Sequence, residues 1–345
     1  MNSKFSRTSF CRVLAMNACL ISFSTNTHAA TCLRGVNIAG AEFGDELGGY
    51  GEAYIYPSDE TLEWAASEGM TAIRLPFKWE RLQPALFGSL DSRELEFLKD
   101  IVAKSNALGL TVILDPHNYA EYRGTRIGNG QVNAAAFADF WQRLAPQFSG
   151  NSEVVYLLMN EPAGLTAATW FPAAQAGIHA IRDAGATNLI MVPGTIWTGA
   201  SHWFDEQDGG SNADLFENIE DPLDNMAFEV HQYMDKDYSG TNSTCPRSHD
   251  AIEALQDMAT WLKTHDFKGF VGEFGGTTSP DCLAGLSDMA AYLNSDSETW
   301  IGWSAWAAGE WWGDYELSLQ PIDGSNTPQM KVLAPHLNDS SNQCG

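Results

Sequence analysis

The stretch Val154–Pro162, VVYLLMNEP, is an apolar run that ends abruptly in polar residues. Its first six side chains are all aliphatic or aromatic, which is typical of a buried β-strand. A carboxylate is costly to bury without a partner, so we expect Glu161 at the strand end, facing a cleft. The rest of the chain has to show how many such strands there are and what faces Glu161.

Short apolar runs of the same kind recur along the 345 residues, beginning 31 to 44 residues apart. Helical patterns lie between many of them. The eight runs begin at Arg34, Thr71, Thr111, Val154, Asn188, Met226, Phe270 and Ile301. Strand and helix alternating eight times predict an α/β fold, a single-domain (β/α)8 TIM barrel.

The ends of the helical patterns carry recognisable signals. In the segment 91–109, apolar residues repeat every three to four positions, and Asp91 or Ser92 can cap the start of the helix. A glycine just before a strand is expected where a helix ends in a left-handed backbone. Four glycines fit this pattern: Gly69, Gly109, Gly185 and Gly269.

Residues 1–30 have the pattern of a secretory signal peptide. Lys4, Arg7 and Arg12 precede the apolar stretch VLAMNACLISF, and small residues follow near Ala29 and Ala30. This stretch is well short of the about 20 residues that cross a bilayer. We therefore expect residues 1–30 to be removed and residues 31–345 to be exported as one extracellular, catalytic barrel domain.

Acidic residues dominate the charge, with 44 Asp and Glu against 19 Lys and Arg. Such a surface disfavours nucleic acid and anionic membranes as partners and would repel anionic polymers, whereas neutral glycans are unaffected. The chain has no CxxC pair and no HxH or HExxH spacing, so neither a metal nor another cofactor is expected.

Four cysteines remain after removal of the signal peptide, an even number for an oxidising compartment. Four cysteines allow three pairings, and the sequence alone cannot choose among them. Our preferred pairing joins Cys245 to Cys282 and Cys32 to Cys344, the second tying the two ends of the chain together.

Polar or aromatic residues gather at the predicted strand ends, where the active sites of TIM barrels lie. A single Arg or His near a strand end is usually structural, but coincidence at seven ends indicates a site. The candidate residues are Arg74, His117, Asn118, Asn160, Glu161, Trp197, His231, Tyr233, Glu273 and Trp306.

Glu161 and Glu273 end the fourth and seventh strands, which face each other across an eight-stranded barrel. Two such carboxylates can cleave a glycosidic bond, one as proton donor and one as nucleophile if about 5 to 5.5 Å separates them. We expect burial or a neighbouring charge to raise the pKa of Glu161. Glu273 stays ionised if Arg74 and Tyr233 donate hydrogen bonds to it.

At these residues the chain resembles glycoside hydrolase family 5 of clan A, and most closely its secreted endo-β-1,4-glucanases, the cellulases. The resemblance covers essentially the whole mature chain, in eight blocks that stand in family order. They are RGVNIAGAEFG, AIRLPFKWERLQP, DPHNYAEYRG, LLMNEPAG, VPGTIWTG, EVHQYMDKDYSGTNSTC, GEFGG and GWSAWAAG.

The resemblance implies a role for each matching residue. Glu161 would be the acid/base and Glu273 the nucleophile, Arg74 would orient Glu273, and Asn160 would hold the 2-hydroxyl of the sugar. Cys245 and Cys282 match the two cysteines of a disulfide found in such cellulases. Cys344 matches another cysteine of the family. It implies that His117, His231 and Tyr233 line the sugar site and that Trp306 is its floor. With the strand-end residues included, the predicted substrate-binding residues are Arg74, His117, Asn118, Asn160, Trp197, His231, Tyr233 and Trp306.

Twelve tryptophans support a carbohydrate partner, because flat apolar rings match the C–H faces of β-linked sugars. The expected substrate is a β-glucan polysaccharide or oligosaccharide, bound by a monomer. A β-mannanase or another β-glycanase of the family is the alternative within the class. A secreted glycan-binding protein without turnover is the alternative outside it. The tryptophans expected on loops at the strand ends are Trp79, Trp197, Trp306, Trp311 and Trp312.

Overall fold

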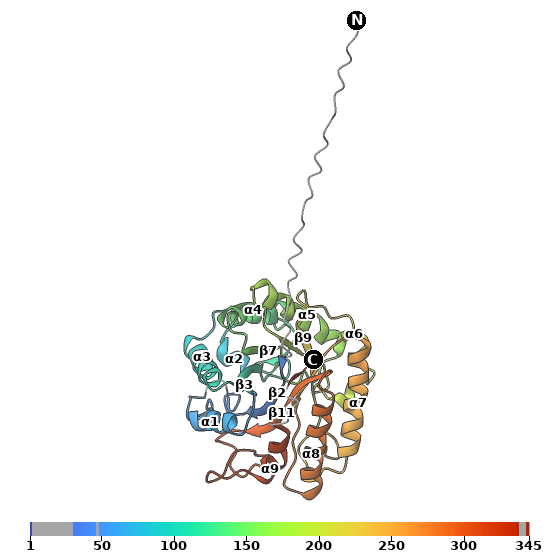
Figure 1. Cartoon of the computed structure of the whole chain (residues 1–345). Coiled ribbons are helices and arrows are strands. Elements are labelled where there is room, and N and C mark those ends of the chain that lie inside the picture. Colours follow the sequence, from blue (N-terminus) through green and yellow to red (C-terminus); the bar gives the residue numbers. More distant parts are fainter. Residues whose placement is uncertain (2–29, 46–47, 338–342, 345) are drawn as a thin grey trace.

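The computed structural model describes residues 1, 30–45, 48–337, 343 and 344, and shows a closed barrel of parallel strands (Figure 1). Each predicted apolar run forms one of its strands, so the predicted (β/α)8 TIM barrel is confirmed. Around the barrel the strands are β10 (Gly269–Glu273), β11 (Trp300–Ala308), β2 (Leu33–Ile38), β3 (Ala72–Phe77), β4 (Thr111–Pro116), β7 (Val154–Leu157), β8 (Ile190–Pro193) and β9 (Met226–His231).

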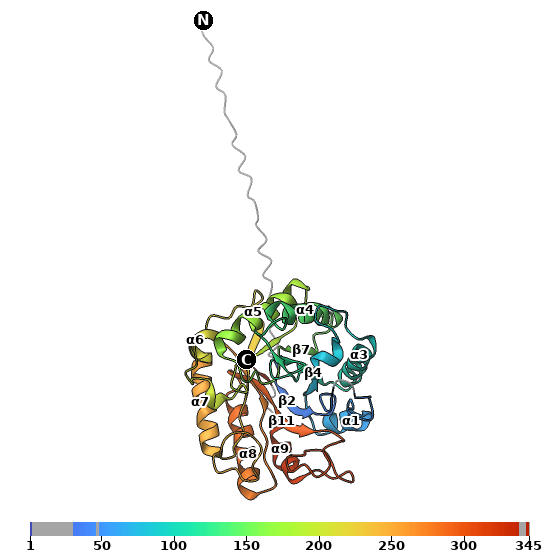
Figure 2. The ribbon, with the colours of Figure 1, turned by 180° about the vertical axis from the view of Figure 1, so that it is seen from behind.

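The helices form a ring around these strands, as both views show (Figures 1 and 2). No helix among the described residues is long and apolar enough to cross a membrane. The predicted signal peptide falls almost wholly on residues outside the described ones. The helices are α1 (Asp59–Ser67), α2 (Trp79–Leu82), α3 (Ser92–Ala107), α4 (Ala134–Leu144), α5 (Ala167–Asp183), α6 (Asn212–Phe216), α7 (Ser248–Thr264), α8 (Pro280–Ser295) and α9 (Pro328–Leu337).

The predicted helix ends are confirmed with one exception. Asp91 caps α3, its carboxylate accepting hydrogen bonds from the backbone of the first turn. Gly69, Gly109 and Gly185 have φ between 81° and 86°, the left-handed backbone expected after a helix. The prediction for Gly269 is wrong, because this residue is already in β10, and Asp266 takes the left-handed position after α7.

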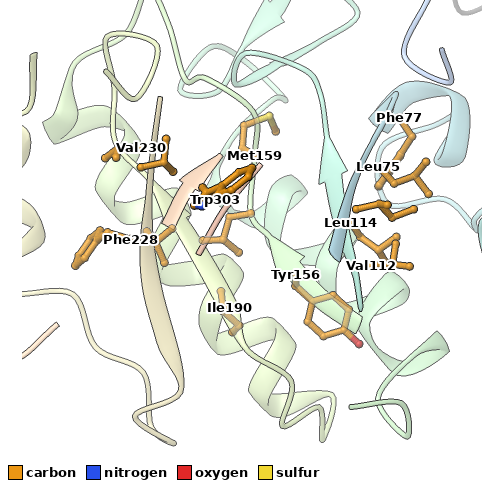
Figure 3. Close-up of a cluster of buried hydrophobic side chains, with 14 of the residues drawn as sticks. Leu75, Phe77, Val112, Leu114, Tyr156, Met159, Ile190, Phe228, Val230 and Trp303 are labelled. Carbon is orange, nitrogen blue, oxygen red and sulfur yellow. The ribbon is translucent and has the colours of Figure 1, made fainter. Parts of the chain in front are cut away.

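Side chains alternate along the strands between two hydrophobic clusters. On β4, Val112 and Leu114 point outward and pack against the helices, in the layer drawn in Figure 3. Ile113 points the other way, into the barrel interior, together with Val155, Leu157, Met191 and Phe270. Since alternate residues share a face, the next inward position on β4 is Asp115. The barrel interior thus changes from apolar to polar near the C-terminal ends of the strands.

Disulfides support both the outer loops and the base of the barrel. Cys245 and Cys282 are bonded, as predicted, and join the loop after β9 to the first turn of α8. Cys32 is also disulfide-bonded. The side chain of Cys344 is outside the described part, so its pairing with Cys32 stays a prediction. The backbone agrees with it, because β1 (Ala30–Thr31) pairs antiparallel with β12 (Gln343–Cys344).

We predict that the double substitution Cys245→Ser, Cys282→Ser lowers the free energy of unfolding by about 2 to 5 kcal/mol, because the bond closes a loop in the unfolded chain. The cysteines are 37 residues apart. Equilibrium unfolding in guanidinium chloride measures the loss. An unchanged transition midpoint would show that this bond does not stabilise the barrel.

Candidate active site

Arg74 lies at the centre of the polar end of the barrel and is fully buried. Its Nη1 donates to Asn37 Oδ1 at 2.8 Å and to Glu273 Oε1 at 2.9 Å, and its Nη2 donates to Asn160 Oδ1 at 2.7 Å. Burial would lower the pKa of Arg74, but the surrounding carboxylates raise it above its ordinary value. The guanidinium is therefore a permanent buried cation that joins several strands.

Glu273, the last residue of β10, is held by two donors. Arg74 binds one carboxylate oxygen, and the hydroxyl of Tyr233 donates to the other at 2.8 Å. Burial raises the pKa of Tyr233 well above its ordinary value, and the charge of Glu273 adds to the rise, so the phenol keeps its proton. Each oxygen of the Glu273 carboxylate thus accepts a hydrogen bond that fixes its orientation.

Glu161 follows β7 in a left-handed backbone with φ of 43° and lies partly open to the cleft. Its Oε1 is 2.7 Å from Nδ1 of His231. Burial raises the pKa of Glu161; the hydrogen bond and charge of His231 oppose the rise, and the charge of Glu273 adds to it. The two glutamates therefore have different environments: Glu273 accepts from a guanidinium and a phenol, whereas Glu161 faces a histidine and has a raised pKa.

The two glutamates also converge in space. One carboxylate oxygen of Glu161, one of Glu273 and a ring nitrogen of His231 all lie within 4.8 Å of one another. Three such atoms could in principle surround a metal ion. Both ring nitrogens of His231 already face carboxylates, however. Two glutamate oxygens within 4.8 Å of each other are compatible with the closely spaced carboxyl groups of retaining glycosidases, about 5 to 5.5 Å apart, and not with the about 6.5 to 9.5 Å of inverting ones.

His117 and Trp306 form one wall of the site. His117 Nδ1 is 2.7 Å from Asp115 Oδ2, and its Nε2 is 3.2 Å from Nδ2 of Asn160. The imidazole stacks on the indole of Trp306, with ring centroids 5.5 Å apart. The indole nitrogen of Trp306 donates to the hydroxyl of Tyr315, so the ring is held in place at the site floor.

Trp197 presents its ring on the other side of Glu161. The residues 196–198 all have left-handed backbones, and 55% of Trp197 is exposed. It lines a cavity of about 480 Å³ that also includes Glu161, His231 and Tyr233. An exposed aromatic ring beside such a cavity has the geometry of a sugar-binding platform.

Two sequence predictions differ from the structure. The carboxamide of Asn118 binds inside the protein, accepting from the backbone N–H of Trp79 and donating to Glu80, at the start of α2. Asn118 therefore supports a helix beside the site, and its predicted contact with substrate has no support. Trp79 is fully buried among aromatic side chains, so it is core and not a sugar platform.

Comparison with known proteins agrees with this geometry. Residues 26–309 match the family model described as cellulase (glycosyl hydrolase family 5). The chain belongs to glycosyl hydrolase family 5. The predicted family and the predicted class of enzyme, a glycoside hydrolase, are thereby confirmed.

Relatives within family 5 cover nearly the whole chain. Endo-β-1,4-glucanase B of Aspergillus niger is 37% identical over 306 residues, which are 88% of this chain and 89% of that protein. The structure of XacCel5A in complex with cellopentaose is 45% identical, with a TM-score of 0.87, covering 89% of this chain and 99% of that one. Endoglucanase Cel5A of Pseudomonas stutzeri, in complex with cellobiose, is 35% identical, with a TM-score of 0.82, covering 88% and 92%.

Three buried polar residues of this family 5 site were missed by the sequence reasoning. Asn37 binds Arg74, Asp115 binds His117, and Glu229 binds His231 at 2.7 Å. The two acidic residues each stand two positions before a histidine in a strand, so acid and histidine share the inward face. That spacing is visible in DPH and EVH and could have identified both pairs.

We predict that Arg74→Met lowers the free energy of unfolding by about 3 to 5 kcal/mol, because buried carboxylates lose their cation. Urea unfolding monitored by fluorescence measures it. The matched control is Arg143→Met, which removes a half-exposed ion pair with Asp139 and should cost about 1 kcal/mol or less. Equal losses in the two variants would contradict a central role for the Arg74 charge.

Proposed function

We propose that this chain is a secreted, retaining endo-β-1,4-glucanase that cleaves internal bonds of β-glucans by double displacement. Glu161 is the acid/base and Glu273 the nucleophile. The observation that carries the proposal is the pair of carboxylates with atoms within 4.8 Å of each other in different environments. The relatives solved with cellopentaose and cellobiose support a β-glucan substrate.

In the first step, an oxygen of Glu273 attacks the anomeric carbon of the sugar. The glycosidic bond breaks as Glu161 gives its proton to the leaving oxygen. Arg74 and Tyr233 hold the carboxylate of Glu273 aligned until it forms the ester. Asn160 has a second amide hydrogen, beside the one directed at His117, with which to bind the 2-hydroxyl.

In the second step, Glu161 is a carboxylate and takes a proton from a water molecule as that water attacks the same carbon. The bond to Glu273 breaks, which restores both glutamates to their starting states. Two inversions give net retention of configuration. Trp306 supports the reacting sugar from below, and Trp197 supports the part of the chain that leaves.

Export is part of the same proposal. The Cys245–Cys282 bond is of the kind that persists in oxidising compartments, in agreement with the predicted signal peptide. An acidic surface does not hinder a neutral glucan. We propose that the protein acts as a monomer, because polymer cleavage at internal bonds needs an open groove.

We predict that the mature chain releases reducing ends from carboxymethylcellulose and mixed-linkage β-glucan, with little release from galactomannan or xylan. Glu273→Ala should abolish release, because no ester can form. Glu253→Ala, the same change at an exposed glutamate of α7, is the control and should stay active. Proton NMR of the first product should show the β-anomer.

The other outcomes separate the alternatives. Release mainly from galactomannan would make the protein a β-mannanase with the same mechanism. If the folded chain releases no reducing ends from any of the four polymers, the result would favour a glycan-binding protein without turnover. A first product with inverted configuration would overturn the nucleophile assignment of Glu273.

We predict that kcat/KM falls as pH rises through the raised pKa of Glu161, because only the protonated form can act as the acid. Glu161→Gln should reduce turnover of mixed-linkage glucan by about 10² to 10⁴-fold. On dinitrophenyl β-cellobioside, whose leaving group needs no proton, kcat/KM should be much less affected by this substitution. The residual activity of Glu161→Gln on mixed-linkage glucan should lose the alkaline decline. An unchanged alkaline decline in the variant would assign it to another group.

A further inference from the structure

Glu229 is a fully buried carboxylate with no access to substrate. It lies on β9, two residues before His231, and its Oε1 is 2.7 Å from Nε2 of that histidine. The same oxygen is 3.5 Å from Nη2 of Arg74. Burying an acid is costly unless it has partners of opposite charge, so its presence beside the site requires a reason.

The neighbouring strand is shaped to seat this carboxylate. A Cβ at Gly272 of β10 would lie 1.7 Å from Glu229 Oε1, so any larger residue would displace the acid. Gly272 does not need a left-handed backbone. The glycine is required for the room it leaves, directly before Glu273.

The two buried acid–histidine pairs have different second partners. Nδ1 of His117 faces Asp115, and its Nε2 faces the amide nitrogen of Asn160, whose orientation is fixed because its oxygen accepts from Arg74. Burial would lower the pKa of His117, but Asp115, Glu273 and Glu42 raise it above its ordinary value. An amide N–H can only donate, so the contact with Asn160 requires an unprotonated Nε2 on His117 and opposes the charged form of this ring. Both nitrogens of His231 face carboxylates instead, which can accept two N–H donors.

The proton count decides what His231 does to Glu161. If His231 is neutral, it donates to Glu229 through Nε2, and its bare Nδ1 accepts the acidic proton from Oε1 of Glu161. That proton is then directed away from substrate. If His231 is an imidazolium, Nδ1 donates to Oε1, and the acidic proton of Glu161 sits on Oε2, free for the leaving oxygen.

We propose that Glu229 is a positioning residue that keeps His231 doubly protonated, so that the acidic proton of Glu161 is presented to the substrate and not to the histidine. The proposal deepens the proposed function and rests on it. A doubly protonated His231 also suits the second step of the reaction. There the same Nδ1–H stabilises Glu161, which is then a carboxylate.

The other charges around His231 agree with this state. Glu161 approaches from β7 and Glu273 from β10, the latter with Oε2 3.6 Å from Nδ1. The cation of Arg74 and the protonated phenol of Tyr233 both bind Glu273. Burial alone would lower the pKa of His231, but Glu229, Glu273 and Glu161 raise it to about 10.

The test is ¹⁵N NMR of histidine-labelled protein, native and Glu229→Gln, with kcat and KM measured on mixed-linkage glucan. The His231 signals are assigned with His231→Asn. We expect both nitrogens protonated in the native enzyme from about pH 5 to 8, and loss of the Nδ1 proton within that range in Glu229→Gln. kcat should fall about 10- to 100-fold with KM nearly unchanged. Glu229→Asp, which keeps the negative charge, should restore part of the Nδ1 protonation of His231 and part of kcat.

The matched control is Glu94→Gln, the same change at a buried carboxylate of α3 that accepts hydrogen bonds from Tyr54 and Tyr56. It should lower the melting temperature without moving the His231 signals. If Glu229→Gln also lowers only the melting temperature, Glu229 is structural and the proposal is overturned. A neutral His231 in the native enzyme overturns it as well. The NMR signals of His231 test this proposal without any measurement of glucan cleavage. If the native enzyme does not cleave glucan, the proposed function is refuted instead.

Discussion

The polar end of this barrel depends on one buried cation, the guanidinium of Arg74. Its donors reach Asn37 on β2, Asn160 after β7 and Glu273 on β10. Its charge also compensates Asp115 on β4 and Glu229 on β9. A planar group with several fixed donors can hold partners on different strands at once, which a lysine ammonium cannot do with the same geometry. Strands far apart in sequence are therefore joined at the level where chemistry takes place.

The two glutamates differ in their contact with this cation. Glu273 receives hydrogen bonds from Arg74 and Tyr233, which fix the direction of its carboxylate. Glu161 has no direct bond to Arg74 among those described, and burial raises its pKa. Its partner is His231, whose own charge state depends on Glu229. A single buried network thus gives two carboxylates, with oxygens less than 5 Å apart, different hydrogen-bond partners.

The two acid–histidine pairs have the same spacing in sequence, but their histidines have different second hydrogen-bond partners. Asp115–His117 and Glu229–His231 both place acid and ring on the same face of a strand. The ring at His117 meets an amide that donates, whereas the ring at His231 meets a second carboxylate that accepts. Each histidine therefore has an acid two residues before it in sequence and a second partner across the barrel, and the second partner is what differs between the two rings.

The sequence by itself determined the barrel, because eight apolar runs separated by helical patterns leave little choice of fold, and the polar residues at their ends marked the site. It also predicted Glu161, Glu273 and Tyr233 at or just after the ends of those runs, whereas Arg74, predicted at a strand end, lies within β3. The tertiary structure decided which polar residues from different strands meet: it directs Asn118 into α2, buries Trp79 in the core, seats Glu229 in the space left by Gly272, and brings His231 to Glu161. Such contacts depend on the closure of the barrel and the direction of each side chain, and a linear pattern of residues does not contain either.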